Sequence, residues 1–213
     1  MYRNPNRCLF LKEYADFLAM HLLPLEILVD FATTVNLLSL PYICVLNFQP
    51  KSMFPSPKIK NLPVTDLIGM KSEMSLIANK TGELWRNFMP RRKEIQNPSS
   101  TALYSIEIYP GLEYFKEFNP ARIFEKWAAI PVSNTDSIPK GMNVIHLPSG
   151  EYAVFNYKGY SSQVGDFYQQ IFENWLPQSG YGLANRPHFA VMGEKYKNDD
   201  PDSEEEIWIP IGK

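Results

Sequence analysis

The last strand-like segment of the chain places one carboxylate beside an aromatic ring. In Glu206 to Ile211 (EIWIPI), Glu206, Trp208 and Pro210 share one face of an extended chain, and the isoleucines share the other. A carboxylate held among rings is costly to keep ionised, because burial disfavours its charged form. An organic cation offsets that cost by direct attraction, and ring faces add cation–π contacts worth about 0.5 to 2 kcal/mol each. Glu206 and Trp208 could therefore meet an organic cation together if both faced a pocket.

Further aromatic side chains are candidate walls of this pocket. The proposed ligand-binding residues are Glu206, Trp208, Trp127, Phe155, Tyr157, Tyr104 and Met192, of which the last two are the weaker candidates. Rigid rings favour ligand cavities, and methionine suits a promiscuous pocket because it repacks easily. The Glu206 carboxylate could also act as a general base toward water if its pKa lay near the working pH. The same residues are thus compatible with a binder of amphipathic cations and with a hydrolase that has Glu206 as its catalytic residue.

The same residues also have simpler structural interpretations. Glu206 ends the acidic run NDDPDSEEE, which by itself is typical of a solvated loop. Trp208 and Phe155 could be ordinary core residues. His146 and His188 have no serine or cysteine partner in a recognisable elbow motif, so we expect no nucleophile triad.

Cysteine use and glycine spacing argue against metal and nucleotide sites. Cys8 and Cys44 stand outside any C-x-x-C or Cys/His cluster. Gly180 and Gly182 lack the strand–helix context of a nucleotide-binding loop. We therefore expect no metal and no cofactor. Residues 54–213 contain no cysteine and could fold in either redox environment, and we favour a cytoplasmic location.

The composition of the chain changes near residue 50. Residues 31–49 carry no charge and approach the length of a bilayer span, but Pro41 interrupts them. We expect residues 1–52 to be an apolar N-terminal extension, either disordered or not part of the natural protein, and we do not expect a membrane partner. Residues 53–213 form the folded domain. With a net charge of −2, the chain has no electrostatic reason to bind nucleic acid directly.

Strand and helix patterns alternate regularly in the second part of the chain. Thr81 is the expected N-cap of a first helix, and Ser161 or Ser162 that of a second, strongly amphipathic helix that Pro177 stops. Strand patterns cover residues 64–75, 102–109, 124–132, 150–157, 188–192 and 206–211.

The two halves of this pattern resemble each other. Laying FEKWAAIPV over EEEIWIPI superposes Pro131 on Pro210 and Trp127 on Glu206. This indicates an α+β fold of two β-α-β-β units with pseudo-twofold symmetry, an antiparallel sheet and helices on one face. Trp127 and Glu206 then take equivalent places at a central ligand cleft between the halves.

Four motifs, in their order and spacing, resemble the GyrI-like effector-binding domain, which also occurs at the ligand end of AraC-type and multidrug-sensing regulators. The motifs are LPSGEYAVFNYKG (147–159), WLPQSGY (175–181), RPHF (186–189) and EIWIPI (206–211). The stretch KTGELWRNFMPRRKEI (80–95) resembles a stand-alone bacterial branch of that family. The resemblance covers about residues 58–212.

The resemblance implies a duplicated β-α-β-β fold and an acidic pocket residue that recognises cationic, apolar compounds, at the position of Glu206. A second glutamate of the family is replaced here by Ala190. One carboxylate instead of two should hold cations less strongly and tolerate neutral ligands better. Some stand-alone members are described as hydrolases of strained compounds. A third expectation is a ligand sensor for transcription regulation without a DNA-binding domain of its own.

Overall fold

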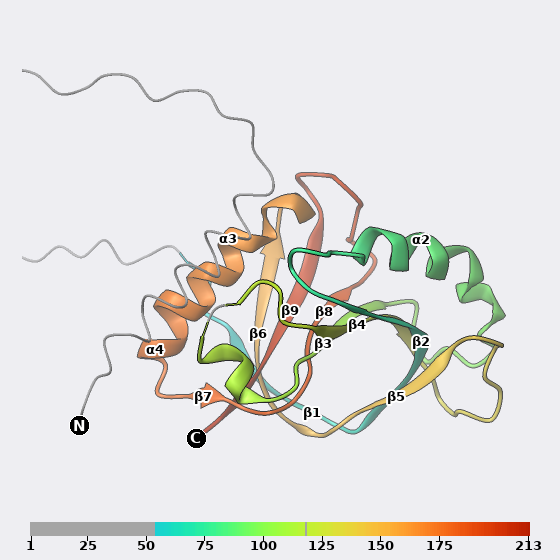
Figure 1. The fold of residues 1–213 in the computed structure, drawn as a ribbon, viewed down its shortest axis with the longest axis horizontal. Helices are drawn as coiled ribbons and strands as arrows, with labels where there is room; N and C mark the ends of the chain where they lie inside the picture. Colours follow the sequence, from blue (N-terminus) through green and yellow to red (C-terminus); the bar gives the residue numbers. More distant parts are fainter. Residues whose placement is uncertain (1–53, 118) are drawn as a thin grey trace, which may run out of the picture.

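The structure, a computed structural model, describes residues 54–117 and 119–213. In this part of the chain, nine strands form one antiparallel sheet with the order β1-β6-β9-β8-β3-β4-β2-β5, and β7 pairs with β9 (Figure 1). The strands are β1 (Lys58–Leu62), β2 (Thr65–Met74), β3 (Leu103–Ile108), β4 (Phe124–Pro131), β5 (Asn143–Leu147), β6 (Gly150–Lys158), β7 (Gly182–Leu183), β8 (His188–Met192) and β9 (Glu204–Gly212).

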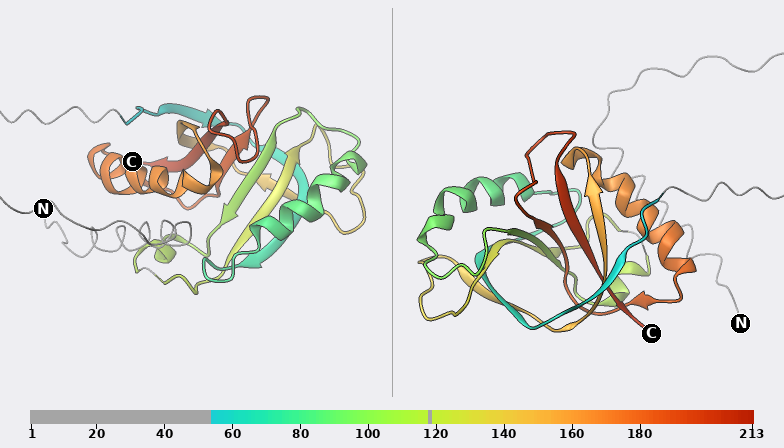
Figure 2. Two further views of the ribbon diagram at one scale, coloured as in Figure 1. Left: turned by 90° about the horizontal axis from the view of Figure 1, so that it is seen from above. Right: turned by 180° about the vertical axis from the view of Figure 1, so that it is seen from behind.

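The helices lie together on one side of this sheet (Figures 1 and 2). The first helix, α2 (Thr81–Arg91), continues into the short 3-10 turn η1 (Arg92–Glu94). The second helix is composite and runs through η3 (Ser161–Gln163), α3 (Val164–Gln169), the π-helical η4 (Gln170–Trp175) and α4 (Leu176–Gln178). A further 3-10 turn, η2 (Leu112–Phe115), follows β3.

The strand pairing obeys a pseudo-twofold axis between β3 and β8. Leu103 pairs with Met192. The residue 85 positions after Leu103 is His188, and the residue 85 positions before Met192 is Glu107, and these two residues also pair. The same shift relates the β1–β6 pairing to the β2–β5 pairing. Each half therefore lends its first strand to the sheet edge of the other half. The predicted duplication, with its antiparallel sheet and helices on one face, is confirmed.

The predicted equivalence of Trp127 and Glu206 holds in the strand register. Trp127 on β4 lies between Lys71 and Ile106, while Glu206 on β9 lies between Asn156 and Val191. These neighbours are themselves related by the shift of 85 positions. The two residues thus occupy matching places in the two halves.

The helix starts differ from the expected caps. Thr81 is the first helical residue of α2 after Lys80, and α3 begins at Val164 after Gln163, with no side-chain cap bond at either start. The capping predictions for Thr81, Ser161 and Ser162 are therefore wrong. At Thr81, the backbone N–H instead bonds to the side chain of Asn79.

The π-helical turn of the second helix immediately precedes Pro177. Proline has no N–H to donate and its ring crowds the carbonyl four residues earlier, which here is Glu173. The widened turn at 170–175 relieves this crowding without ending the helix, which closes at Gln178. Pro177 therefore reshapes the helix end, one residue before the stop.

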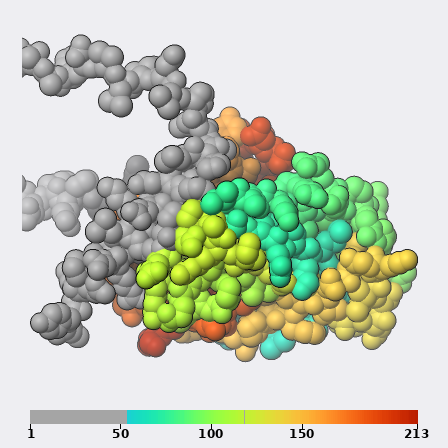
Figure 3. Space-filling model, viewed as in Figure 1, coloured from blue at the N-terminus to red at the C-terminus, as the bar shows by residue number. Residues whose placement is uncertain are grey.

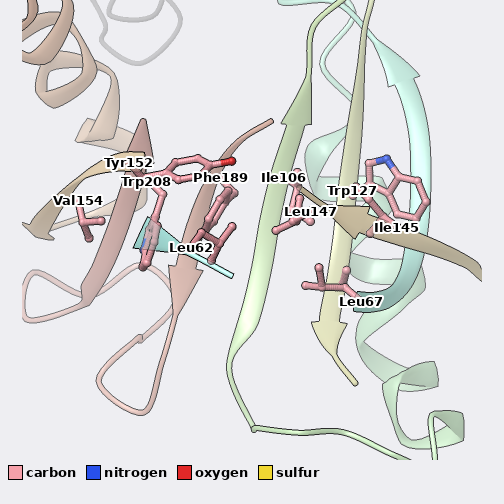
Figure 4. Packing of buried hydrophobic residues seen from close by; sticks show 11 residues of the cluster. Leu62, Leu67, Ile106, Trp127, Ile145, Leu147, Tyr152, Val154, Phe189 and Trp208 are labelled. Carbon is pink, nitrogen blue, oxygen red and sulfur yellow. The ribbon is translucent and has the colours of Figure 1, made fainter. Parts of the chain in front are cut away.

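The sheet buries apolar side chains on both faces. On the helix side, Leu84 and Phe88 of α2 pack against the first half, and Ile171 and Phe172 pack against the isoleucines of β9. On the opposite side, eleven buried residues form one cluster that crosses both halves (Figure 4). We call this side the aromatic face; its buried members are Leu62, Leu67, Ile106, Trp127, Ala129, Ile145, Leu147, Tyr152, Val154, Phe189 and Trp208.

Two earlier expectations concern residues beyond this description. The expected extension at residues 1–52 and the domain boundary at Met53 lie outside the described residues. Within the described ranges, no helix is long and apolar enough to cross a membrane.

Candidate functional site

The candidate site lies on the aromatic face, where two rows of side chains cross the central strands. Successive pairings join the members of each row from β4 through β3 and β8 to β9. One row is Trp127, Ile106, Phe189 and Trp208, and the other is Ala129, Tyr104, Val191 and Glu206. The pseudo-twofold axis exchanges the two rows, so Glu206 and Trp127 stand at opposite corners of this grid.

Four aromatic rings pack closely together beside Glu206 on this face. Phe189 stacks on Trp208 with centroids 5.2 Å apart, and Tyr104 stacks on Phe189 at 5.7 Å. Tyr152 meets both Phe189 and Trp208, at 5.2 and 5.8 Å. Figure 4 shows Tyr152, Phe189 and Trp208 close together. Aromatic contacts of this kind hold the ring positions rigid.

Glu206 sits at the half-exposed rim of these rings, in contact with two donors. Its carboxylate accepts a hydrogen bond from the Trp208 indole N–H at 3.0 Å and pairs with the Lys60 ammonium at 2.8 Å. Lys60 also lies over the Trp208 ring, 5.0 Å from its centroid. The two charged side chains are 36–37% exposed. We call Glu206, Trp208 and Lys60 the β9 clamp.

Two tyrosines on this face have raised pKa values. Burial raises the pKa of Tyr104, and the negative charge of Glu206 raises it further. Burial also raises the pKa of Tyr152, against the opposing charge of Arg186, whose guanidinium lies 5.2 Å from the ring centroid. The Tyr152 hydroxyl is buried and makes no hydrogen bond to any described residue. Both phenols therefore stay protonated and can donate hydrogen bonds.

A second arrangement of the same composition lies on β4. The Trp127 indole N–H donates to Glu125 at 2.6 Å, Lys71 pairs with Glu125 at 2.7 Å, and Lys71 lies 5.4 Å from the Trp127 centroid. We call these three residues the β4 clamp. In both clamps a glutamate precedes its tryptophan by two positions, so both side chains emerge on the same face of the strand.

The structure separates the predicted site residues into two groups. Glu206, Trp208, Trp127 and Tyr104 share the aromatic face. Three other expected wall residues lie on the helix side of the sheet: Phe155, Tyr157 and Met192. Successive side chains of a strand alternate between faces, so β6 sends Tyr152 and Val154 to the aromatic face and Phe155 and Tyr157 to the helices.

Sequence reasoning missed two residues of this site. Lys60 lies on β1, a strand that was not predicted, although the alternation in KIKNL was a usable signal. Tyr152 lies on a strand whose two faces are both apolar, so alternation could not tell which of its rings lies on the aromatic face.

A polar cluster occupies the helix side of the central strands. Lys126 pairs with Glu107 at 2.6 Å, and both side chains are largely buried. Burial raises the pKa of Glu107, but Lys126 and the Tyr109 hydroxyl outweigh it and leave a lowered value. Burial lowers the pKa of His188 to about 4 despite the attraction of Glu107. Burial also raises the pKa of Glu205, against the opposing charge of Lys126.

A surface hollow of about 500 Å³ lies apart from both clamps. Its lining comes entirely from residues 110–123, the yellow-green segment on the surface in Figure 3. Its walls carry charges of both signs, Glu113, Glu117, Lys116 and Arg122 among them, so it has no single charge preference. Within the described ranges, no three histidine, cysteine, aspartate or glutamate side chains group as metal ligands would.

Solved structures with the same fold come from bacterial regulators and integron cassettes. An integron cassette protein from Vibrio cholerae matches with a TM-score of 0.54 at 15% identity, over 75% of this chain and 97% of that one. A putative transcription regulation protein from Staphylococcus aureus matches at 0.53 and 16%, over 74% and 98%. SAV2435, solved bound to tetraphenylphosphonium, matches at 0.53 and 17%, over 74% and 94%.

Sequence comparisons agree with this fold. The transcriptional regulator BrlR of Pseudomonas aeruginosa is 26% identical over 155 residues, which is 72% of this chain and 54% of BrlR. The chain thus spans about half the length of that relative. The sequence model described as integron-associated effector binding protein matches residues 58–211, which include β1 to β8, β9 as far as Ile211, and all members of both clamps. The resemblance to GyrI-like domains is therefore confirmed, and the chain belongs to the family of integron-associated effector-binding proteins.

Proposed function

We propose that this protein binds amphipathic, often cationic small molecules on its aromatic face, with Glu206 as the recognition charge. The observation that carries the proposal is the β9 clamp, in which a carboxylate lies beside an indole ring at the rim of a rigid aromatic surface. A ligand cation placed there would meet the carboxylate and the ring together, which is the chemistry that favours organic ammonium and phosphonium groups.

Two further features support a ligand on this face. The Tyr152 hydroxyl is buried beside Trp208, with the Arg186 guanidinium close by but no well-formed hydrogen bond to a described residue, and such groups are rare unless something else satisfies them. The Tyr104 ring lies in the same row as Glu206, whose negative charge helps to raise the pKa of the Tyr104 hydroxyl. Tyr104 is partly exposed and can donate to a polar atom of a ligand, whereas the Tyr152 hydroxyl becomes available only to a ligand that opens the ring packing.

The relatives favour an effector of this class. SAV2435 has been solved with tetraphenylphosphonium, a bulky lipophilic cation, and shares the fold. The match to BrlR supports a role in regulation, in which ligand binding by this domain informs a partner that contacts DNA. For this chain, absence of direct DNA binding and a cytoplasmic location stay predictions.

The rival function, a hydrolase with Glu206 as general base, has less support. A general base must be free to reach a water molecule and take its proton. One oxygen of the Glu206 carboxylate pairs with Lys60 and the other accepts from the Trp208 N–H, so a water molecule would compete with both donors. This arrangement favours recognition of charge over proton abstraction. Recovery of intact ligand after long incubation distinguishes the binder from the hydrolase.

Titration of the full chain with tetraphenylphosphonium and a panel of lipophilic cationic dyes tests the proposal. We expect saturable binding that weakens about tenfold or more in Glu206→Gln, which corresponds to roughly 1.4 kcal/mol. Glu204→Gln is the matched control, because Glu204 lies on the same strand and pairs with Lys195 at 2.9 Å, outside the clamp. It should leave the affinity within twofold of the original.

Two results contradict the proposal. Equal affinity of the original protein and Glu206→Gln would remove Glu206 as the recognition charge. Equal losses in Glu204→Gln and Glu206→Gln would show a general effect of net charge and not a site.

A further inference from the structure

The β9 clamp is already filled by a cation that belongs to the chain. We propose that Lys60 is a built-in competitor of the ligand, and that a cationic effector binds by displacing the Lys60 ammonium from Glu206 and the Trp208 ring. This inference rests on the proposed function and adds to it the residue that sets the affinity threshold for cations.

Lys60 makes the two contacts that the proposal assigns to a ligand cation. Its ammonium pairs with Glu206 at 2.8 Å and lies 5.0 Å from the Trp208 centroid. The carboxylate and the ring face are the two halves of a cation site, and one charge cannot be added while another occupies both. A ligand cation and Lys60 therefore exclude each other.

The displacement is feasible because the pair is exposed. The Lys60 and Glu206 side chains are 37% and 36% accessible, and ion pairs of such exposure contribute little net energy. Once released, the flexible lysine stem can turn its charge to water and recover rotamer freedom. Lys60 should therefore weaken cation binding by a factor of roughly three to ten, without blocking it.

The position of Lys60 follows from the exchange of first strands between the halves. β1 pairs with β6 of the other half, which brings Lys60 to a residue 146 positions away. Lys58 is on the same strand and points to the same face, but its side chain has no ion pair or hydrogen bond among the described residues. Lys58 is thus a matched control for the charge of Lys60.

The β4 clamp shows the same occupation. Lys71 holds Glu125 at 2.7 Å and covers Trp127, so this carboxylate–indole pair is also filled by a lysine. The aromatic face therefore has no described glutamate–tryptophan pair that is open to a cation without displacement of a lysine. A cation therefore binds here only if it competes successfully with a lysine, which favours lipophilic cations that also stack on the rings.

Calorimetric titration with tetraphenylphosphonium tests the inference on the full chain and four variants: Lys60→Met, Lys58→Met, Glu206→Gln and the double variant Lys60→Met/Glu206→Gln. Methionine keeps an unbranched apolar stem and removes the charge. We expect Lys60→Met to bind three- to tenfold more tightly and Lys58→Met to stay within twofold of the original. The gain from Lys60→Met should disappear when Glu206 is already glutamine. Melting curves confirm that each variant is folded.

The possible outcomes separate the two proposals. If Glu206→Gln weakens binding but Lys60→Met leaves it unchanged or weaker, the competitor role is overturned and the proposed function stands. Equal gains in Lys60→Met and Lys58→Met, or a gain that persists in the double variant, also overturn it, because the effect is then one of net charge. If Glu206→Gln binds as well as the original protein, the proposed function fails.

Discussion

Two glutamate–lysine pairs lie on opposite faces of the sheet. Glu206 and Lys60 pair at 2.8 Å on the aromatic face with both side chains more than a third exposed, whereas Glu107 and Lys126 pair at 2.6 Å on the helix side with Lys126 only 10% exposed. Similar distances therefore hide different energetics. Separating the exposed pair costs little free energy, because water solvates both charges. Separating the buried pair costs much more, because it leaves a charge buried without a partner. The comparison indicates that exposure makes the β9 clamp exchangeable and the buried pair structural.

The largest expected effect comes from opening the buried pair. Lys126→Met leaves Glu107 with only the Tyr109 hydroxyl and should lower the free energy of unfolding by about 3 kcal/mol. Urea denaturation measures this loss. Lys71→Met removes one partner of a more exposed pair and should cost less than about 1 kcal/mol. Similar losses in the two variants would break the contrast between the faces.

The second effect tests the burial of the helix-side cluster through pH. His188 has a pKa near 4 in the folded protein against 6.5 for a free imidazole side chain, so the unfolded chain binds more protons between these values. The contribution of His188 to the free energy of unfolding is therefore fully present above pH 6.5. It is lost as the pH falls toward 4, by roughly 3 kcal/mol. The lowered pKa of Glu107 adds a further loss of folding stability as the pH falls. The raised pKa of Glu205 has the opposite effect, because the folded state then binds a proton more readily than the unfolded chain.

His188→Phe should flatten this pH dependence between 6.5 and 4. The His188 ring stacks on Phe115 and Phe172, so a phenyl ring fits the same contacts. His146 is the control, because its side chain is 66% exposed and its replacement by glutamine should change the slope little. Denaturant midpoints at a series of pH values give the measurement, and an unchanged slope in His188→Phe contradicts the assignment.

The third effect concerns the ring of the β9 clamp. Trp208→Phe keeps an aromatic surface but removes the N–H that donates to Glu206 at 3.0 Å. Affinity for tetraphenylphosphonium should fall about fivefold, because the carboxylate loses one fixed donor and part of its ring face. Trp127→Phe makes the same change in the β4 clamp and should affect binding less. An equal fall in both variants would mean that the two halves share the recognition.

The smallest effect is on stability and completes the contrast. Lys60→Met should change the free energy of unfolding by less than about 1 kcal/mol, since its pair with Glu206 is exposed. The same urea experiment that measures Lys126→Met resolves this difference. A loss near that of Lys126→Met would show that Lys60 is a structural residue and not an exchangeable cation.

Much of the site could be predicted because alternation in β9 is unambiguous. Ile207, Ile209 and Ile211 form one apolar face, so Glu206 and Trp208 had to take the other. In β6 both faces are apolar, and the sequence contains no local reason for Tyr152 and not Phe155 to face the aromatic side. The same ambiguity in HFAVM placed Met192 in the expected pocket, while its side chain lies toward the helices.

Sequence alone determined the duplication, the pairing of Trp127 with Glu206 as equivalent residues, and the face on which the carboxylate emerges. These follow from periodicities of two and 3.6 residues and from a repeat, all of which are local properties of the chain. Only the tertiary structure decided what the carboxylate touches. Lys60 reaches Glu206 because β1 crosses to the edge of the other half, and such long-range strand exchange leaves no trace in a local pattern. Glu206 could be identified from its own segment, whereas its partner Lys60 lies on a strand far away in the sequence.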